Sequence, residues 1–188
     1  ITIYIEPSPR IDLIVNDTIC NEDFIVFQVT NPNVTLGEWK YQLIVDYGEF
    51  LTGMLPEDSI YTELRLDEQL FNSDTSWHEA IYKFIPRIDP VDGDPTCDNF
   101  TDTLFVPVRV NPTPAIRVIA TDSVLCNGID PAEINIRNPN EFVYGQWVYD
   151  LEVIPDDPLH LSGYRDGDTS LVDLQIIDNL VNTDTVVH

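Results

Sequence analysis

The sequence predicts an all-β fold built from tandem antiparallel β-sandwich repeats that are joined by short Pro-x-Pro linkers. Apolar residues recur at every second position, which is typical of strands with one buried face. The 14 prolines, together with Asn-Pro-Asn and Asp-Gly turns, divide these runs into short segments. Several motifs occur twice, roughly 105 residues apart, which indicates two copies of one unit.

The first strand of the complete unit is predicted at residues 11–15, where Ile, Leu and Val stand at alternate positions. The clearest alternation is WKYQLIV at 39–45, and the second copy repeats the two patterns at 116–118 and 147–153. Further strands are predicted at residues 60–66, 80–85 and 103–110. No apolar stripe of helical period lasts three turns, so about seven short strands per unit are expected, as in a β-sandwich.

Paired motifs define the limits of the copies. IEPSPRIDL at 5–13 returns as VNPTPAIRV at 110–118, and GEWKYQLIV at 37–45 returns as GQWVYDLEV at 145–153. The offset grows slightly along the chain, because loops tolerate insertions that strands do not. We therefore expect a window from a longer array. It comprises a closing strand of a preceding repeat plus linker (1–7), a complete repeat (8–112), and a second repeat (113–188) that stops before its last strands.

The chain is strongly acidic. It has 33 acidic and 9 basic residues, for a formal net charge of −24. A field of this sign repels nucleic acid and anionic lipid, so neither is expected as a partner. No apolar run approaches the roughly 20 residues that cross a bilayer, so membrane insertion is not expected. Calcium, basic partners and simple solubility remain as uses of the acidic surface.

The three cysteines fit the repeat. Cys20 and Cys126 are equivalent, and the counterpart of Cys97 would fall beyond His188. One Cys20–Cys97 disulfide per unit is the simplest prediction, and it implies an oxidising, extracytoplasmic setting. Two buried free thiols are the alternative, since sequence alone cannot give the connectivity.

The loop at residues 87–102 has the most functional character. Its dense carboxylates are hard oxygen ligands of the kind that Ca²⁺ prefers, although their spacing does not match an EF-hand. A solvated acidic loop with several turns is the alternative. The segment RDGDTS at 165–170 is a second, weaker calcium candidate. The predicted calcium ligands are Asp89, Asp92, Asp94, Asp98 and Asp102.

Trp39 and Trp147 stand at equivalent places within alternating apolar strands. This placement predicts that both tryptophans belong to the cores of their units. Exposed platforms on which carbohydrate could stack are the alternative.

Each copy begins with a Pro-x-Pro phrase, in which Pro7 and Pro9 correspond to Pro112 and Pro114. Proline has a fixed φ and no N–H, so these residues cannot join a sheet ladder. A short Pro-x-Pro segment favours extended geometry. The phrase therefore predicts a stiff hinge between neighbouring units.

No catalytic motif is recognisable in the sequence. His78 and His188 are equivalent but a full repeat apart, which disfavours a shared metal site, and His160 stands alone. Carboxylates abound without a basic or nucleophilic residue at a recurring place. We therefore expect a non-catalytic protein with no cofactor except possible Ca²⁺.

The joint VNPTPAI, the start VLCNG and the closing segment YKFIPRIDPVDGDPTCDNFTDT resemble the PKD-like (Ig-like) repeats of giant proteins secreted by Bacteroidetes. The resemblance covers essentially the whole chain. Such arrays include gliding-motility adhesins and are exported by the type 9 secretion system. The resemblance implies a location at the extracellular cell surface and an elongated stalk.

The same resemblance implies O-glycosylation at Asp-Ser/Thr followed by an aliphatic residue. Thr18 and Ser123 match this pattern at equivalent places in the two copies. The residues that match the pattern are Thr18, Ser59, Thr103, Ser123 and Thr185.

The predicted function is that of a structural repeat region in a long extracellular surface fibre or adhesin. Its partners would be neighbouring repeats of the same chain and other copies in a filament. Residues 1–5 would close the sheet of a preceding unit, normally in the same polypeptide, or by donation between chains. The alternatives are a glycan- or protein-binding β-sandwich module, or an accessory domain of a secreted enzyme.

Overall fold

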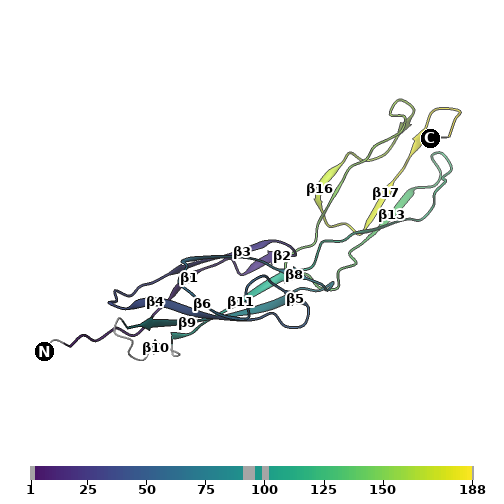
Figure 1. Ribbon diagram of the computed structural model, residues 1–188. Helices are drawn as coiled ribbons and strands as arrows, with labels where there is room; N and C mark the ends of the chain where they lie inside the picture. The colour runs from purple at the N-terminus through teal and green to yellow at the C-terminus, as the bar shows by residue number, and fades with distance from the viewer. Residues whose placement is uncertain (1–2, 91–95, 99–101, 188) are drawn as a thin grey trace. The chain divides into compact units, whose positions relative to one another are not determined.

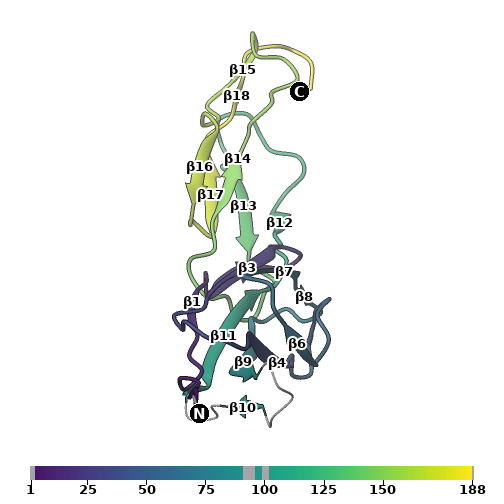
Figure 2. The same cartoon turned by 60° about the vertical axis from the view of Figure 1, so that its left-hand side comes forward.

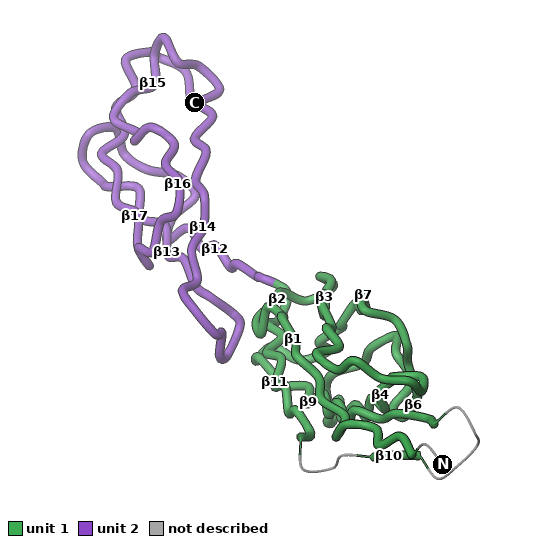
Figure 3. The backbone as a smooth tube through the Cα atoms, turned by 90° about the vertical axis from the view of Figure 1, so that its left-hand side faces the viewer, with its two compact units in different colours: residues 1–113 green, residues 114–188 purple. Residues whose placement is uncertain are grey.

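The computed structural model describes residues 3–90, 96–98 and 102–187. The chain divides into two compact units, Ile1–Thr113 (unit 1) and Pro114–His188 (unit 2) (Figure 3). Every regular element of the described residues longer than one residue is a β-strand. The all-β prediction is confirmed.

Unit 1 contains two sheets and a two-stranded ribbon (Figure 1). One sheet has the order β1-β3-β7, and the other has the order β2-β11-β9-β4-β6, with β10 also paired to β9. The ribbon joins β5 to β8. The strands are β1 Asp12–Ile14, β2 Thr18–Cys20, β3 Phe24–Thr30, β4 Glu38–Asp46, β5 Leu51–Thr52, β6 Asp58–Tyr61, β7 Arg65–Gln69, β8 Phe71–Asn72, β9 His78–Asp89, β10 Cys97–Asp98 and β11 Leu104–Asn111.

Strand β4 forms because its apolar residues alternate with more polar ones. Alternate side chains of a strand point to opposite faces of the sheet, so one face can be buried completely. The buried face of β4 consists of Trp39, Tyr41, Leu43 and Val45. Strand β4 pairs with β9 in unbroken antiparallel register, from Glu38 opposite Asp89 to Asp46 opposite Ile81. The long strand β9 therefore forms the centre of the larger sheet.

The two sheets of unit 1 face each other across one hydrophobic core. The centroid of the Phe27 ring on β3 lies 4.6 Å from that of the Tyr82 ring and 5.4 Å from that of the Phe84 ring. Tyr82 and Phe84 both belong to β9. In Figures 1 and 2, β1 and β3 lie on one side of unit 1, and β4, β9 and β11 lie on the other. Each large side chain buried in this way contributes about 1.5–3 kcal/mol. Unit 1 is thus a β-sandwich.

Unit 2 has a smaller core. Ile136, Tyr149 and Ile176 are buried, and Trp147 packs against them while half-buried. By the repeat alignment, residues 114–187 correspond to unit 1 only as far as the residue before β9, since His78 at the start of β9 is equivalent to His188. The sheets are β12-β13-β17, β14-β16 and β15-β18, with strands β12 Arg117–Ala120, β13 Ala132–Arg137, β14 Tyr149–Leu151, β15 Leu161–Ser162, β16 Asp168–Leu171, β17 Gln175–Asp178 and β18 Val181–Asn182.

The predicted closing strand at residues 1–5 is only partly described. Ile3, Tyr4 and Ile5 belong to no strand of this chain, and their side chains are 81%, 73% and 91% exposed. Residues 1–2 lie outside the described residues. The sheet that this segment would complete belongs to a different unit, so its pairing stays a prediction.

Candidate functional site

The backbone after the first Pro-x-Pro phrase is held from two sides. The Arg10 N–H donates to Asn33 Oδ1 at 2.7 Å, and the Trp39 Nε1–H donates to the Arg10 carbonyl at 2.9 Å. The Asn33 amide also donates to the Ser8 carbonyl at 2.9 Å. Asn33 is held in turn, because its N–H donates to Asn31 Oδ1 in the Asn-Pro-Asn turn. We call this set of bonds the linker clamp.

Unit 2 contains the same clamp. The Ala115 N–H donates to Asn140 Oδ1 at 3.1 Å, and the Trp147 Nε1–H donates to the Ala115 carbonyl at 3.0 Å. The Asn140 N–H donates to Asn138 Oδ1 at 2.9 Å. Ala115 follows Pro114 as Arg10 follows Pro9 in unit 1. The recurring Asn-Pro-Asn and Trp motifs thus hold the residue after each Pro-x-Pro phrase in the same way.

Other bonds also recur at matching places. The Tyr41 hydroxyl donates to the Glu63 carbonyl at 2.8 Å, and the Tyr149 hydroxyl donates to the Asp173 carbonyl at 2.8 Å. In unit 1 the Asn72 N–H donates to Asn21 Oδ1 at 2.6 Å, and in unit 2 the Asn182 N–H donates to Asn127 Oδ1 at 2.8 Å. Over the described residues, the two units therefore share a common hydrogen-bonding plan.

The predicted hinge prolines differ in exposure. Pro9 and Pro112 are buried, whereas Pro7 and Pro114 are exposed. The hydroxyl of Thr113, between Pro112 and Pro114, accepts a bond from Asn21 Nδ2 at 2.7 Å. The stiffness of the hinge stays a prediction.

The two tryptophans differ in burial, and Trp39 does not form an open platform. Trp39 is 8% exposed and belongs to the unit 1 core. Trp147 is half-buried and stacks obliquely on Tyr149, with 5.5 Å between ring centroids. A sugar stacks on an aromatic face that is open to solvent, and Trp39 does not offer one.

The predicted Cys20–Cys97 disulfide is wrong. Cys20 pairs with Asn111 at the end of β11, and the neighbouring Val110 pairs with His78 at the start of β9. Cys97 pairs with Ile88, near the other end of β9. About ten residues of β9 separate these two ends, which corresponds to roughly 33 Å. A disulfide requires Cα atoms within about 7 Å. Cys20, Cys97 and Cys126 are all free thiols, so the chain gives no disulfide argument for an oxidising compartment.

Three of the five predicted calcium ligands lie in the described residues, and Asp92 and Asp94 lie outside them. Each of the three is paired with a basic side chain. The ion pairs are Asp89 with Lys40, Asp98 with Arg87 at 2.7 Å, and Asp102 with Arg10 at 3.8 Å. Protein cations thus already offset part of the carboxylate repulsion that suggested calcium. Calcium binding by this loop stays a prediction.

Asp89 is the most constrained of these carboxylates. The hydrogen bond from Lys40 holds the pKa of Asp89 below its usual range, against an opposing effect of burial, and a bond from Thr96 acts in the same direction as Lys40. Its Oδ1 atom is buried and has no hydrogen-bond partner among the described residues. The Lys40–Asp89 pair therefore joins β4 to the end of β9.

Glu68 is a buried acidic residue that the sequence analysis did not single out. Its side chain is fully buried in unit 1 and accepts hydrogen bonds from the Tyr47 and Tyr82 hydroxyls and from the Leu55 N–H at 3.0 Å. Burial, together with the Glu68 carboxylate, raises the pKa of both tyrosines. An alternating strand pattern gives no signal for such a residue, because Glu68 occupies an inward position where an apolar side chain is expected.

The second calcium candidate, 165–170, contains an ion pair. Arg165 Nε donates to Asp178 Oδ1 at 3.0 Å, and the Arg165 N–H donates to Asp178 Oδ2 at 3.1 Å. The latter bond matches the one from Leu55 to Glu68 in unit 1. Calcium binding at 165–170 also stays a prediction.

The predicted glycosylation sites differ in accessibility. Ser123 and Thr185 are exposed, whereas Thr18, Ser59 and Thr103 are half-buried. Thr18 lies in β2 and Ser59 in β6. A sugar on an exposed hydroxyl needs no rearrangement of the fold, so Ser123 and Thr185 are the more favourable of the five.

In unit 1, His78 has a structural role. Its Nε2 atom lies 2.8 Å from Asp74 Oδ2, and its ring stacks on Phe50 with 4.6 Å between centroids. The bond from His78, and then the bond from the Thr75 N–H, hold the pKa of Asp74 below its usual range. His188, the equivalent of His78, lies outside the described residues.

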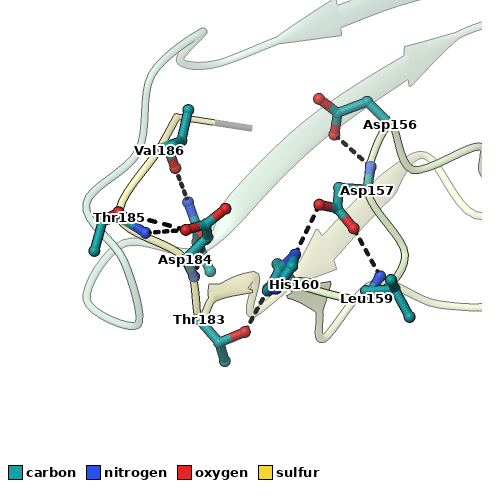
Figure 4. A network of polar contacts seen from close by, with 9 residues as sticks. Asp156, Asp157, Leu159, His160, Thr183, Asp184, Thr185 and Val186 are labelled. Carbon is teal, nitrogen blue, oxygen red and sulfur yellow. Dashed lines mark hydrogen bonds and ion pairs between the residues drawn. The ribbon is translucent and has the colours of Figure 1, made fainter.

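His160 does not stand alone in the structure. Its Nδ1 atom lies 2.7 Å from Asp157 Oδ2, and one potential ligand atom from each of Asp157, His160 and Asp184 lies within 4.8 Å of the others (Figure 4). We call these three residues the Asp-His-Asp cluster. The Asp-x-x-His spacing at 157–160 was visible in the sequence, but Asp184 is brought near only by the pairing of β15 with β18.

An apolar cavity of about 180 Å³ opens into unit 2. Its lining includes Ile134, Leu151, Val153, Leu161, Ile176 and Leu180. By the repeat alignment, these residues correspond to core residues of unit 1, namely Phe27, Leu43, Val45, Leu51, Leu66 and Leu70. The cavity therefore lies in the part of unit 2 that corresponds to the core of unit 1.

Comparisons with known proteins identify no family. No protein-family model matches the sequence, and no curated protein matches it. Among solved structures, the chain is similar to a cohesin module from a family 33 glycoside hydrolase of Clostridium perfringens ATCC13124. The similarity has a TM-score of 0.35 at 11% sequence identity and covers 56% of this chain and 98% of the cohesin chain. Within the described residues, no helix has the length and hydropathy needed to cross a membrane.

Proposed function

We propose that the chain is a run of tandem β-sandwich modules from a long extracellular bacterial surface fibre or adhesin, and that its role is structural and non-catalytic. The observation that carries the proposal is the linker clamp. The same Asn and Trp donors and acceptors hold the residue after Pro-x-Pro in unit 1 and in unit 2. A device repeated at each joint suits a protein whose task is to connect modules in series.

The pairing of β2 with β11 supports a mechanical role for unit 1. The two strands are parallel, with Thr18 opposite Arg109 and Cys20 opposite Asn111. Tension along the chain would pull the start of β2 and the end of β11 in opposite directions along the strand axis. Their hydrogen bonds must then break together rather than one after another. The Arg109 N–H adds a bond to the Asp17 carbonyl at 2.8 Å.

The acidic surface fits this role. A net charge of −24 keeps laterally adjacent chains apart and soluble. The extracellular location and the export route rest on the sequence resemblance to PKD-like repeats, since the cysteines no longer support an oxidising compartment.

Surface exposure tests the proposal. Antibodies raised against unit 1 should label intact cells that make the protein, and protease added outside those cells should remove the label. The mass of the protein released from the cells should exceed that of this 188-residue chain several-fold if modules are arrayed. Labelling only after lysis would refute the surface location, and a released protein of about this chain's own mass would refute the array.

The alternative is a glycan- or protein-binding module, or an accessory domain of a secreted enzyme. The burial of Trp39 counts against carbohydrate stacking at that residue. Saturable binding of the chain to a defined glycan on an array, lost when a surface residue is changed, would favour this alternative over a stalk.

A further inference from the structure

The Asp-His-Asp cluster lies where two distant segments of unit 2 meet. Strand β15 pairs with β18, with Leu161 opposite Asn182 and Ser162 opposite Val181. The Thr183 N–H extends this ladder by donating to the His160 carbonyl at 2.9 Å. The residue before β15 and the residues after β18 are therefore held at the same end of the ribbon by backbone bonds.

The side chains of the cluster are positioned by local bonds (Figure 4). Asp157 Oδ1 accepts the Leu159 N–H at 2.9 Å, which leaves Oδ2 directed at the imidazole of His160. Asp184 Oδ1 accepts the Thr185 N–H at 2.6 Å. Asp157 and His160 are half-buried, and Asp184 is exposed. The cluster thus combines one imidazole with two carboxylates at a partly exposed place.

Unit 1 provides an internal comparison. Its β5-β8 ribbon corresponds to β15-β18, and the Thr75 N–H donates to Asp74 Oδ1 as the Thr185 N–H donates to Asp184. However, Phe50 precedes β5 at the place that His160 has before β15. Both units therefore have the ribbon and one carboxylate after it, Asp74 or Asp184. Only unit 2 adds the carboxylate of Asp157 and the imidazole of His160 at these positions.

The donor set indicates the kind of ion. Calcium takes six to eight oxygen ligands, whereas imidazole together with carboxylate suits divalent first-row metals such as zinc. Two carboxylates balance the charge of one divalent ion, and water can fill the remaining positions because the site is partly exposed. We propose that Asp157, His160 and Asp184 bind a divalent transition-metal ion, such as Zn²⁺, at a site present in unit 2 and absent from the corresponding ribbon of unit 1.

The ion would take the place of the proton between Asp157 Oδ2 and His160 Nδ1. Metal–donor distances near 2.0–2.2 Å place tetrahedral donors roughly 3.4 Å apart. Asp157 Oδ2 and His160 Nδ1, now 2.7 Å apart, would therefore separate slightly to admit the ion, and the Asp184 carboxylate would complete the set of three protein donors. These adjustments would fall on the three side chains, because backbone bonds hold the ribbon in place. The bound ion would join the loop before β15 to the turn after β18.

Isothermal titration of the full chain with ZnCl₂ tests the proposal. The three cysteines are first replaced by serine, because free thiols bind zinc themselves. One saturable site per chain is expected. His160→Phe, which installs the residue that unit 1 carries, should weaken binding at least ten-fold, and Asp184→Asn should also weaken it. The matched change His78→Phe in unit 1 should leave it unaltered.

A second measurement covers the case in which a variant folds poorly. In the cysteine-free chain, the imidazole resonances of His160 should shift on addition of zinc, while those of His78 stay in place. The proposal is overturned if no saturable binding is found, if His160→Phe binds zinc as tightly as the parent, or if zinc shifts the resonances of His78 and leaves those of His160 unchanged.

Discussion

The linker clamp makes a quantitative prediction for Trp39→Phe. The change removes the Nε1–H that donates to the Arg10 carbonyl at 2.9 Å. That lost bond costs about 1 kcal/mol, because the carbonyl can regain water in an exposed segment. Trp39 is 8% exposed, so the smaller ring also gives up roughly 40 Å² of buried apolar surface, or about 1 kcal/mol. The free energy of unfolding of unit 1 should fall by about 2 kcal/mol.

Native-state hydrogen exchange of the full chain measures this loss in unit 1 alone. A decrease of about 2 kcal/mol corresponds to a roughly 30-fold loss of protection in β4 and β9 amides that exchange by global unfolding of the unit. Trp147→Phe is the matched control and should leave those amides unchanged. Replacing Trp39 by benzothienylalanine, which keeps the bicyclic shape without the N–H, should cost only about half as much. A loss below about 0.5 kcal/mol for Trp39→Phe would refute the clamp as a stabilising element.

Three further predictions concern unit 1 and the thiols. Glu68→Ala should destabilise unit 1 by about 3 kcal/mol or more in urea unfolding, since the buried Tyr82 hydroxyl and the Leu55 N–H lose their acceptor, whereas Ala at the exposed Glu57 should cost almost nothing. The pKa of Asp89 is lower in the folded chain than in the unfolded chain, where it is near 4. The bond to Lys40 therefore stabilises the fold fully above about pH 4, and this stabilisation is lost as the pH falls through the folded-state pKa. Asp89→Asn should therefore flatten the fall of Tm below pH 4, and an unchanged acid limb would contradict the pairing. Thiol titration of the unreduced, denatured chain should find three free cysteines, and a count of one would restore a disulfide.

Much of the unit 1 sandwich could be predicted from local pattern. The alternation at 39–45 became the buried face of β4, the run at 80–85 lies within β9, and the run at 103–110 overlaps β11 in all but its first residue. These predictions succeeded because the side-chain period of a strand is fixed by its backbone geometry, and burial of one face follows from it. The repeated Asn-Pro-Asn and Trp motifs were also visible, although their joint action on the residue after Pro-x-Pro was not.

The functional residues depended on pairing between distant segments. Cys20 and Cys97 fitted a disulfide by spacing and repeat logic, but the register of β9 with β10 and β11 sends them to opposite ends of a long strand. Asp184 approaches His160 only because β18 pairs with β15. No local periodicity encodes such a register.

The sequence by itself determined the strand class, the faces of the main strands and the doubling of motifs, because each depends on near neighbours along the chain. Only the tertiary structure decided which strands pair, and therefore that Cys20 and Cys97 are apart, that Asn33 and Trp39 meet at Arg10, and that an imidazole and two carboxylates converge in unit 2. The physical reason is that contacts between distant segments follow from strand register, and register is selected by the packing of the whole core rather than by any single segment.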